Sequence, residues 1–277
     1  MNINETCAYF AETARNKARI AAGAPGAFFC GSMLAGAYVG IALILAWTTS
    51  FGTPAGVRPL IQGSVFGIGL ILVVLAGAEM FTGHVMYETF GLSKRTIGLV
   101  DLIRLFVLVW IGNLVGAAIL SFIFARAGGL IFTAGDKAPG DVLTGVLTKK
   151  ETSPFLVLFC KATLCNWLVC LAIWLAARLK SETAKMIGIA WCLLAFVACG
   201  FEHSVANMTA VCLGLFADKP IGSLGGAFYN LGVVTLGNLV GGALFVTGAY
   251  LWSARGEALT LSPAAPASAT AAALDRP

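Results

Sequence analysis

The sequence predicts an all-α membrane protein whose six transmembrane helices form an inverted 3+3 repeat, with the second and fifth helices broken. Three observations support this fold class. The 277-residue chain is 58% hydrophobic and only 11% charged, with a mean hydropathy of +0.88, whereas about 25% of residues are charged in an ordinary soluble domain. Its apolar runs reach or exceed the about 20 residues that cross a bilayer. Two short motifs also occur twice, in the same order.

The repeated motifs keep nearly constant spacing. Gly-Ala-Glu at 77–79 returns as Gly-Phe-Glu at 200–202, and Gly-Asn-Leu-Val-Gly at 112–116 returns identically at 237–241. The separations are 123 and 125 residues, which indicates an internal duplication. Each half contains three crossings. Because three is an odd number, the second half must enter the membrane upside down.

The N-terminal residues 1–27 are predicted to form a helix that lies on the membrane surface. Apolar residues recur at helical spacing between positions 3 and 21, and the basic residues lie off this stripe. The six-helix domain follows over residues 28–252, with repeat halves at about 28–126 and 153–252. Residues 253–277 are rich in Ala, Pro and Ser, and we expect a disordered tail.

Single apolar helices are expected for four of the six crossings, at about residues 28–47, 105–124, 154–177 and 224–252. The other two apolar segments, about 60–92 and 184–216, are too long for one straight crossing. We interpret each as two half-helices joined by a non-helical turn, near 79–83 and 200–204. The polar residues 127–152 are interpreted as a loop between the halves.

The distribution of basic residues predicts the orientation. With both termini in the cytoplasm, the cytoplasmic segments carry 11 of the 18 Lys and Arg residues and the outer segments carry 6. The net charge of +5 therefore reflects topology, and we expect membrane lipid as a partner but no nucleic acid. The eight cysteines form no Cys-x-x-Cys pair, and two histidines are too few for a zinc cluster. We expect no metal and no cofactor.

Four ionisable residues lie deep in apolar segments: Glu79, Lys161, Glu202 and His203. A charge inside a membrane costs at least a few kcal/mol, so such residues face a bundle interior or a cavity. Each glutamate has two interpretations: a packing role, in which the carboxylate caps backbone N–H groups freed by the helix break, or a place on a transport pathway. Lys161 is either an internal counter-charge or a positive field for a passing anion.

His203 is the strongest candidate for chemistry, because histidine changes its charge near neutral pH. It follows Glu202 at the predicted break, where the ends of half-helices meet a pathway. His84 lies just past the first break and is interpreted as structural or vestibular. Haem ligation by the two histidines is an alternative, although their positions in the repeats do not match.

Polar and apolar side chains near the breaks complete the set of candidates. Thr82 has a hydroxyl donor in the first break, and Asn166, Asn113 and Asn238 are predicted to be buried amides. The Gly-Asn-x-x-Gly pattern around the last two permits close helix packing. Aromatic and aliphatic residues of the broken helices and the fourth span are candidates for apolar constrictions: Phe66, Leu70, Phe81, Val169 and Phe196.

Several of these motifs resemble the formate/nitrite transporter family. They are Ala-Glu-Met-Phe-Thr-Gly at 78–83, Lys161 to Ala172, Gly-Phe-Glu-His-Ser-Val-Ala-Asn-Met at 200–208 and both Gly-Asn-Leu-Val-Gly motifs. The resemblance covers about residues 5–252, and the stretch 161–174 looks most like the nitrite-channel branch. It implies an aquaporin-like fold, a homopentamer with one pore per protomer, and a bacterial cytoplasmic (inner) membrane location.

The resemblance also implies roles for individual residues. His203 resembles the central pore histidine, and Thr82 matches the threonine that faces it. Asn166 and Asn238 match pore-lining asparagines. Lys150 matches a lysine that draws anions into the periplasmic vestibule. The five apolar residues named above match two hydrophobic constrictions, and Met80 replaces the more usual leucine.

The resulting hypothesis is a channel or transporter for small monovalent anions, nitrite first, in which His203 relays a proton to the anion. A formate or hydrosulfide channel of the same family is the nearest alternative. A haem-binding membrane redox subunit is an alternative from a different class. We expect no enzymatic activity, because no nucleophile–base spacing supports an intramembrane enzyme built on Glu79, Glu202 and a cysteine.

Overall fold

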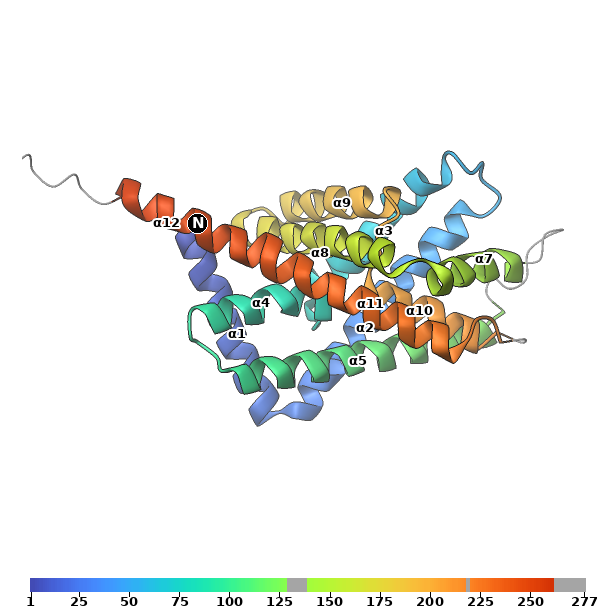
Figure 1. The fold of residues 1–277 in the computed structure, drawn as a ribbon, viewed down its shortest axis with the longest axis horizontal. Coiled ribbons are helices and arrows are strands. Elements are labelled where there is room, and N and C mark those ends of the chain that lie inside the picture. The colour runs from blue at the N-terminus through green and yellow to red at the C-terminus, as the bar shows by residue number, and fades with distance from the viewer. Residues whose placement is uncertain (129–138, 218–219, 262–277) are drawn as a thin grey trace, which may run out of the picture.

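The computed structural model describes residues 1–128, 139–217 and 220–261, which form α-helices and two short π-helices joined by turns (Figure 1). Five helices in this part of the chain are long and apolar enough to cross a membrane. The fifth predicted crossing consists instead of two shorter helices, as expected for a broken segment. The predicted all-α membrane fold is confirmed.

The first half contains five helices. In order, they are α1 (Ile3–Gly23), α2 (Pro25–Ser50), α3 (Arg58–Ile71) with its π-helical extension η1 (Leu72–Gly77), α4 (Phe81–Ser93) and α5 (Leu99–Arg126). A capping box begins α1: the Asn2 side chain accepts from the Glu5 amide, and the Glu5 carboxylate accepts from the Asn2 amide. A helix is therefore present at the predicted N-terminal position.

The second half repeats this order. It consists of α7 (Pro139–Thr152), α8 (Phe155–Arg178), α9 (Glu182–Ala198), α10 (Ser204–Leu215), α11 (Leu224–Val240), η2 (Gly241–Gly248) and α12 (Ala249–Leu261). The interpretation of residues 127–152 as a loop was wrong for 139–152, which form the counterpart of α1. Leu143 and Leu147 bury one face of α7 against α10 and α11. The expected tail at 253–277 was wrong for 253–261, which continue α12, and 262–277 lie outside the described residues.

Both broken helices are interrupted at a glycine with a left-handed backbone. Gly77 has φ +83° and Gly200 has φ +68°, a conformation that side chains disfavour. After Gly77 the chain is non-helical for residues 78–80, so the first break lies slightly before the predicted 79–83. The second break spans residues 199–203 and matches the prediction.

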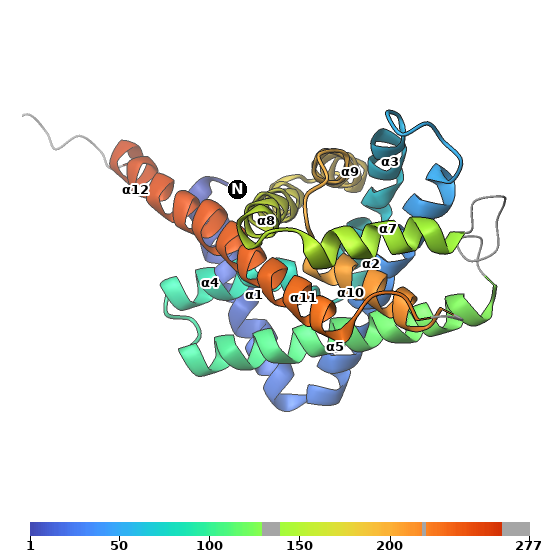
Figure 2. The ribbon, with the colours of Figure 1, turned by 45° about the vertical axis from the view of Figure 1, so that its right-hand side comes forward.

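The two halves place their short helices at opposite ends of the molecule. In Figures 1 and 2, α1 and α4 lie at one end of the long axis, whereas α7 and α10 lie toward the other. The helices α2, α5, α8 and α11 run along this axis. On the outer side of α5, large apolar residues are exposed at helical spacing, as a lipid-facing helix requires: Val100, Ile103, Val107 and Ile111.

Candidate functional site

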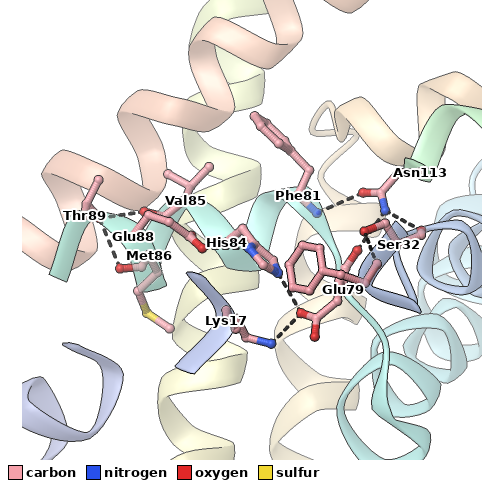
Figure 3. Close-up of polar contacts among 11 residues, drawn as sticks. Lys17, Ser32, Glu79, Phe81, His84, Val85, Met86, Glu88, Thr89 and Asn113 are labelled. Carbon is pink, nitrogen blue, oxygen red and sulfur yellow. Dashed lines mark hydrogen bonds and ion pairs between the residues drawn. The ribbon is translucent and has the colours of Figure 1, made fainter. Parts of the chain in front are cut away.

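An asparagine holds the first helix break in place. Asn113 on α5 is fully buried. Its Oδ1 accepts from the backbone N–H of Phe81 at 2.9 Å, and its Nδ2 donates to the carbonyls of Ser32 at 2.7 Å and Glu79 at 2.8 Å (Figure 3). One side chain thus satisfies three backbone groups that lipid could not satisfy.

Asn238 on α11 holds the second break in the same way. Its Oδ1 accepts from the N–H of Ser204 at 2.9 Å, and its Nδ2 donates to the carbonyls of Ala162 at 2.8 Å and Glu202 at 3.1 Å. We call these two sets of three hydrogen bonds the asparagine brackets. Asn238 therefore serves as framework, and the expectation that it lines the pore is not reflected in its contacts.

The carboxylates do not cap the breaks, contrary to one interpretation of the sequence. Glu79 instead accepts from Lys17 Nζ on α1, and Glu202 accepts from Lys150 Nζ on α7 at 2.6 Å. The asparagine amides take over the capping because they can both donate and accept, whereas an ionised carboxylate only accepts. Each short surface helix is thereby tied to the break of its own half.

A third residue completes each carboxylate site, at equivalent positions 123 residues apart. In the second half, Asn207 Nδ2 donates to Glu202 at 2.7 Å, and its Oδ1 accepts from Lys150 at 2.7 Å. In the first half, His84 takes the place of this asparagine and contacts Glu79 at 2.7 Å. The duplicated framework thus has an amide at one end and a titratable imidazole at the other.

The ring of His203 is held by two hydrogen bonds. It is the N-cap residue of α10, where its Nδ1 accepts from the N–H of Ala206 at 3.1 Å. Its Nε2 lies 3.0 Å from Oγ1 of Thr82, which is on α4 two residues after the first break. Because Nδ1 accepts, the neutral ring carries its proton on Nε2 and donates it to Thr82. The expected pairing of these two residues across the halves is present.

A very small apolar cavity borders His203, with a volume of about 10 Å³, which is roughly the room that one water molecule needs. We call it the constriction. Four of the five predicted constriction residues line it together with His203: Phe66, Leu70, Val169 and Phe196. Phe196 stacks on the His203 ring, with centroids 5.9 Å apart, and meets Phe66 edge-on at 5.4 Å.

Two sequence candidates lie away from this cavity. Phe81 packs edge-on against Phe106 of α5, with ring centroids 5.6 Å apart, and Met80 lines the constriction in its place. Asn166 is fully buried and donates to the carbonyl of Asn238 at 2.7 Å, so its contacts support the second bracket. Met80 is equivalent to His203 in the repeat, so one apolar and one titratable side chain from matching positions line the same cavity.

On the α7 side, the constriction opens into a cavity of about 390 Å³, which we call the α7 vestibule. It is lined by Lys149, Lys150, Lys161 and Glu202, with His203 at its base. Three lysines and one glutamate leave a surplus of two positive charges. Within the described part of the chain, Lys150 is paired with Glu202, whereas the side-chain ammonium of Lys161 makes no hydrogen bond or ion pair. Lys150 is therefore the direct counter-charge of Glu202, and Lys161 acts on this carboxylate only through its electrostatic field.

At the opposite end lies a larger cavity of about 860 Å³, the α1 vestibule. Its charged side chains are balanced, with two lysines and two glutamates (Lys17, Lys185, Glu79 and Glu182), and the N-terminal Met1 also lines it. The electrostatic field therefore differs between the two ends of the pathway, although the backbone framework is shared.

The haem alternative finds no support in the contacts of the histidines. Both ring nitrogens of His203 are hydrogen-bonded to Thr82 and Ala206, and both nitrogens of His84 contact carboxylates. Neither residue has a bare nitrogen directed at an open space that would hold iron. In the described residues, no group of His, Cys, Asp and Glu side chains has the geometry of a metal site.

Sequence reasoning missed Lys17, Asn207 and Glu88 as members of these sites. Lys17 lies off the apolar stripe of α1, which is the face expected to point to water. Asn207 and His84 occupy the same position in the two repeats, so aligning the halves beyond the Gly-x-Glu motif would have revealed this pair. Glu88, four residues after His84 on α4, is one helical turn away and faces the same side.

Comparisons with known proteins agree with this architecture. The profile of the family described as formate/nitrite transporter matches residues 4–252. A protein described as nitrite transporter NirC from Escherichia coli (strain K12) is 43% identical over 244 residues, which cover 88% of this chain and 89% of that protein.

Two solved structures share the fold. One, described as an FNT family ion channel, has a TM-score of 0.86 and 41% identity, and the match covers 90% of this chain and 99% of that one. The other, a pentameric formate channel with formate bound, has a TM-score of 0.72 and 31% identity, covering 82% and 96%. The chain belongs to the formate/nitrite transporter family.

Proposed function

We propose that this protein conducts nitrite through a pore that runs from the α7 vestibule, past His203 and Thr82, to the α1 vestibule. The observation that carries this proposal is the placement of one histidine in an apolar constriction that adjoins a positively charged cavity. The positive charge concentrates anions. The apolar walls oppose a bare charge, so a small anion that can accept a proton passes best.

The choice of nitrite over formate is supported by the relative described as a nitrite transporter, at 43% identity. The solved formate channel is 31% identical, and formate or hydrosulfide remains the alternative. Both anions are small, carry one charge and become neutral acids on taking up one proton. A pore of this kind distinguishes them through size and proton affinity.

In this proposal His203 relays a proton without net consumption. The resting ring carries hydrogen on Nε2 and accepts from Ala206 at Nδ1. A proton that arrives at Nδ1 breaks the helix cap, and the Nε2 proton passes to the anion. The neutral acid then crosses the constriction. When it returns its proton to Nε2, the ring releases the Nδ1 proton and the cap re-forms, so the anion leaves with its charge.

Lys161, rather than Lys150, is proposed to capture the anion. The charge of Lys150 is offset by Glu202 at 2.6 Å, and its remaining donor capacity serves Asn207. The Lys161 ammonium has no such partner among the described residues and lines the same vestibule. Its backbone carbonyl accepts from the Glu202 amide, so the residue is anchored next to the second break.

Replacing Lys161 with Gln is expected to lower nitrite flux from the α7 side roughly threefold to tenfold at low ionic strength and sub-saturating nitrite. The effect should shrink in high salt, because the field of one charge is screened. Initial rates in proteoliposomes at two salt concentrations measure this. Lys149→Gln is the matched control, since Lys149 is exposed and its removal should have a smaller effect. Equal flux in Lys161→Gln and wild type at low salt would exclude the capture role.

The substrate assignment is tested by flux of nitrite and formate into proteoliposomes of the wild-type protein. We expect nitrite to pass faster than formate at equal concentration and at the same pH. If formate passes faster than nitrite, the proposal of an anion channel stands but its preferred substrate is formate. If neither anion passes through correctly inserted protein, the proposal is rejected. Empty liposomes measure the diffusion of the neutral acids.

The assembly and orientation follow from the same comparisons and from charge. We propose a homopentamer, as in the solved pentameric formate channel, in the cytoplasmic membrane of a bacterium. Both termini are proposed to be cytoplasmic, which places the α1 vestibule inside and the α7 vestibule outside. Chemical crosslinking in native membranes tests the number of protomers.

A further inference from the structure

A cluster of buried ionisable groups lies behind the α1 vestibule and has no part in the proposed relay. His84 contacts Glu79 Oε2 through Nε2 at 2.7 Å and Glu88 Oε1 through Nδ1 at 2.8 Å (Figure 3). The side chains of His84 and Glu88 are fully buried, whereas that of Glu79 is 19% exposed. Lys17 reaches the same Glu79 oxygen from α1.

Counting hydrogens shows that this cluster holds one more proton than its neutral ring supplies. A neutral imidazole has one N–H and one bare nitrogen. Two ionised carboxylates at hydrogen-bond distance from its two nitrogens need two N–H donors. Either the ring is an imidazolium, or one carboxyl group is protonated and donates to the ring. In both cases Glu79, His84 and Glu88 together carry one additional proton.

The second half shows that the framework itself does not require this proton. Asn207 occupies the position of His84, contacts Glu202 as His84 contacts Glu79, and extends to Asn230 at 2.8 Å instead of a carboxylate. An uncharged amide is therefore sufficient to support a break. A second observation points to proton exchange: Glu88 Oε2 is buried without a hydrogen-bond partner, which is costly for a charged oxygen.

The cluster has a single group in contact with the α1 vestibule. Glu79 lines that cavity together with Lys17 and Tyr87, while His84 and Glu88 lie behind it. Within the described residues, the other ionisable groups near the cluster include Lys17 and Tyr9 of α1, Tyr87 of α4 and Cys170 of α8. The Phe28 ring packs edge-on against the His84 ring, with the two ring centroids 5.8 Å apart. Among the described residues, the contact of Glu79 with both the vestibule and His84 offers the route for a proton into the cluster.

We propose that Glu79, His84 and Glu88 form a proton-binding site that exchanges with the α1 vestibule and sets the charge an anion meets there. With the additional proton, the net charge of the cluster together with Lys17 is zero. Without it, they carry one negative charge and repel anions. The first part of this proposal stands without the proposed function, and the effect on anions rests on it.

The proton site is tested first without any transport assay. The chain has two histidines, so His203→Asn labelled with ¹⁵N-histidine reports His84 alone. We expect both ring nitrogens to carry hydrogen at neutral pH, and Glu88→Gln to remove one of them. Infrared spectra detect the other distribution of the proton, a protonated carboxyl band that Glu88→Gln abolishes. The proposal is overturned if neither signal is present between about pH 5 and pH 8.

The effect on anions is tested with His84→Asn, which copies the residue of the second half. In wild-type protein of one orientation, acidifying the α1 side is expected to raise nitrite flux from that side roughly twofold to fivefold, as one added charge predicts. His84→Asn should abolish this dependence and keep the dependence on pH at the α7 side. A wild-type protein without nitrite flux would reject the proposed function and leave the spectroscopic test intact. If the wild-type protein conducts nitrite but its flux does not change with the pH on the α1 side, the inference is rejected.

Discussion

Nitrite flux in His203→Ala is expected to fall at least about tenfold and to lose its dependence on pH at the α7 side, because proton transfer by a positioned side chain is usually worth at least that much. The histidine is the sole titratable side chain that lines the constriction among the described residues. Initial rates in proteoliposomes between about pH 5 and pH 8 measure both quantities. Unchanged flux with unchanged pH dependence would remove His203 from the mechanism.

His203→Asn separates proton transfer from structure. Asparagine is a good N-cap residue, so its side-chain oxygen can still accept from the Ala206 amide, and its NH₂ group can reach toward Thr82. It does not titrate in this pH range. We expect it to insert and elute like wild type and to conduct as poorly as His203→Ala. Flux restored by asparagine would show that a hydrogen-bond donor is enough and that no proton is relayed.

Substituting Gly116 with alanine is expected to prevent assembly of a stable protein. An added Cβ would lie 1.8 Å from the carbonyl oxygen of Met33 and 2.6 Å from its carbon. Because both are backbone atoms, α5 would have to move away from α2. Asn113 lies one turn earlier on α5, so its bond to the Ser32 carbonyl would lengthen as well. We expect a loss of about 3 kcal/mol or more.

The yield of monodisperse protein after detergent extraction and its thermal midpoint measure this loss. Gly232→Ala on α11 is the matched control, since no heavy atom lies within 4 Å of its added Cβ. Alanine is favoured over glycine in a helix by about 1 kcal/mol, so the control should be as stable as wild type or more so. Similar midpoints for the two variants would show that the helix pair tolerates the displacement.

The fold was readable from the sequence because its main signals are local and repeated. Membrane-length apolar runs, a glycine followed two residues later by a glutamate, and an identical five-residue motif located both broken helices. The break near residue 200 was predicted correctly, and the left-handed backbone of Gly200 in the Gly-x-Glu motif is what interrupts the helix there. Four constriction residues were likewise placed together, although through resemblance to the family.

The parts that could not be predicted depend on partners far apart in the chain. Lys17 lies 62 residues before Glu79, and no local pattern joins them. Residues 139–152 were interpreted as a polar loop because α7 has only a short apolar stripe. Leu143 and Leu147, which lie at helical spacing and are buried, did indicate a helix. The asparagines, and not the glutamates, cap the helix breaks because one amide can both donate and accept hydrogen bonds. Composition alone does not reveal which of these residues lies beside a break.

The asparagine brackets have a consequence for the order in which the chain assembles. Asn113 joins Ser32, Glu79 and Phe81, which all belong to the first half, and Asn238 joins only residues of the second half. During synthesis, the first half can therefore close its own break as soon as α5 has entered the bilayer, before the second half has been translated.

The contact between Thr82 and His203 needs both halves. The pore is thus the last feature to form, and an unfinished chain left in the membrane has sealed polar groups but no open path.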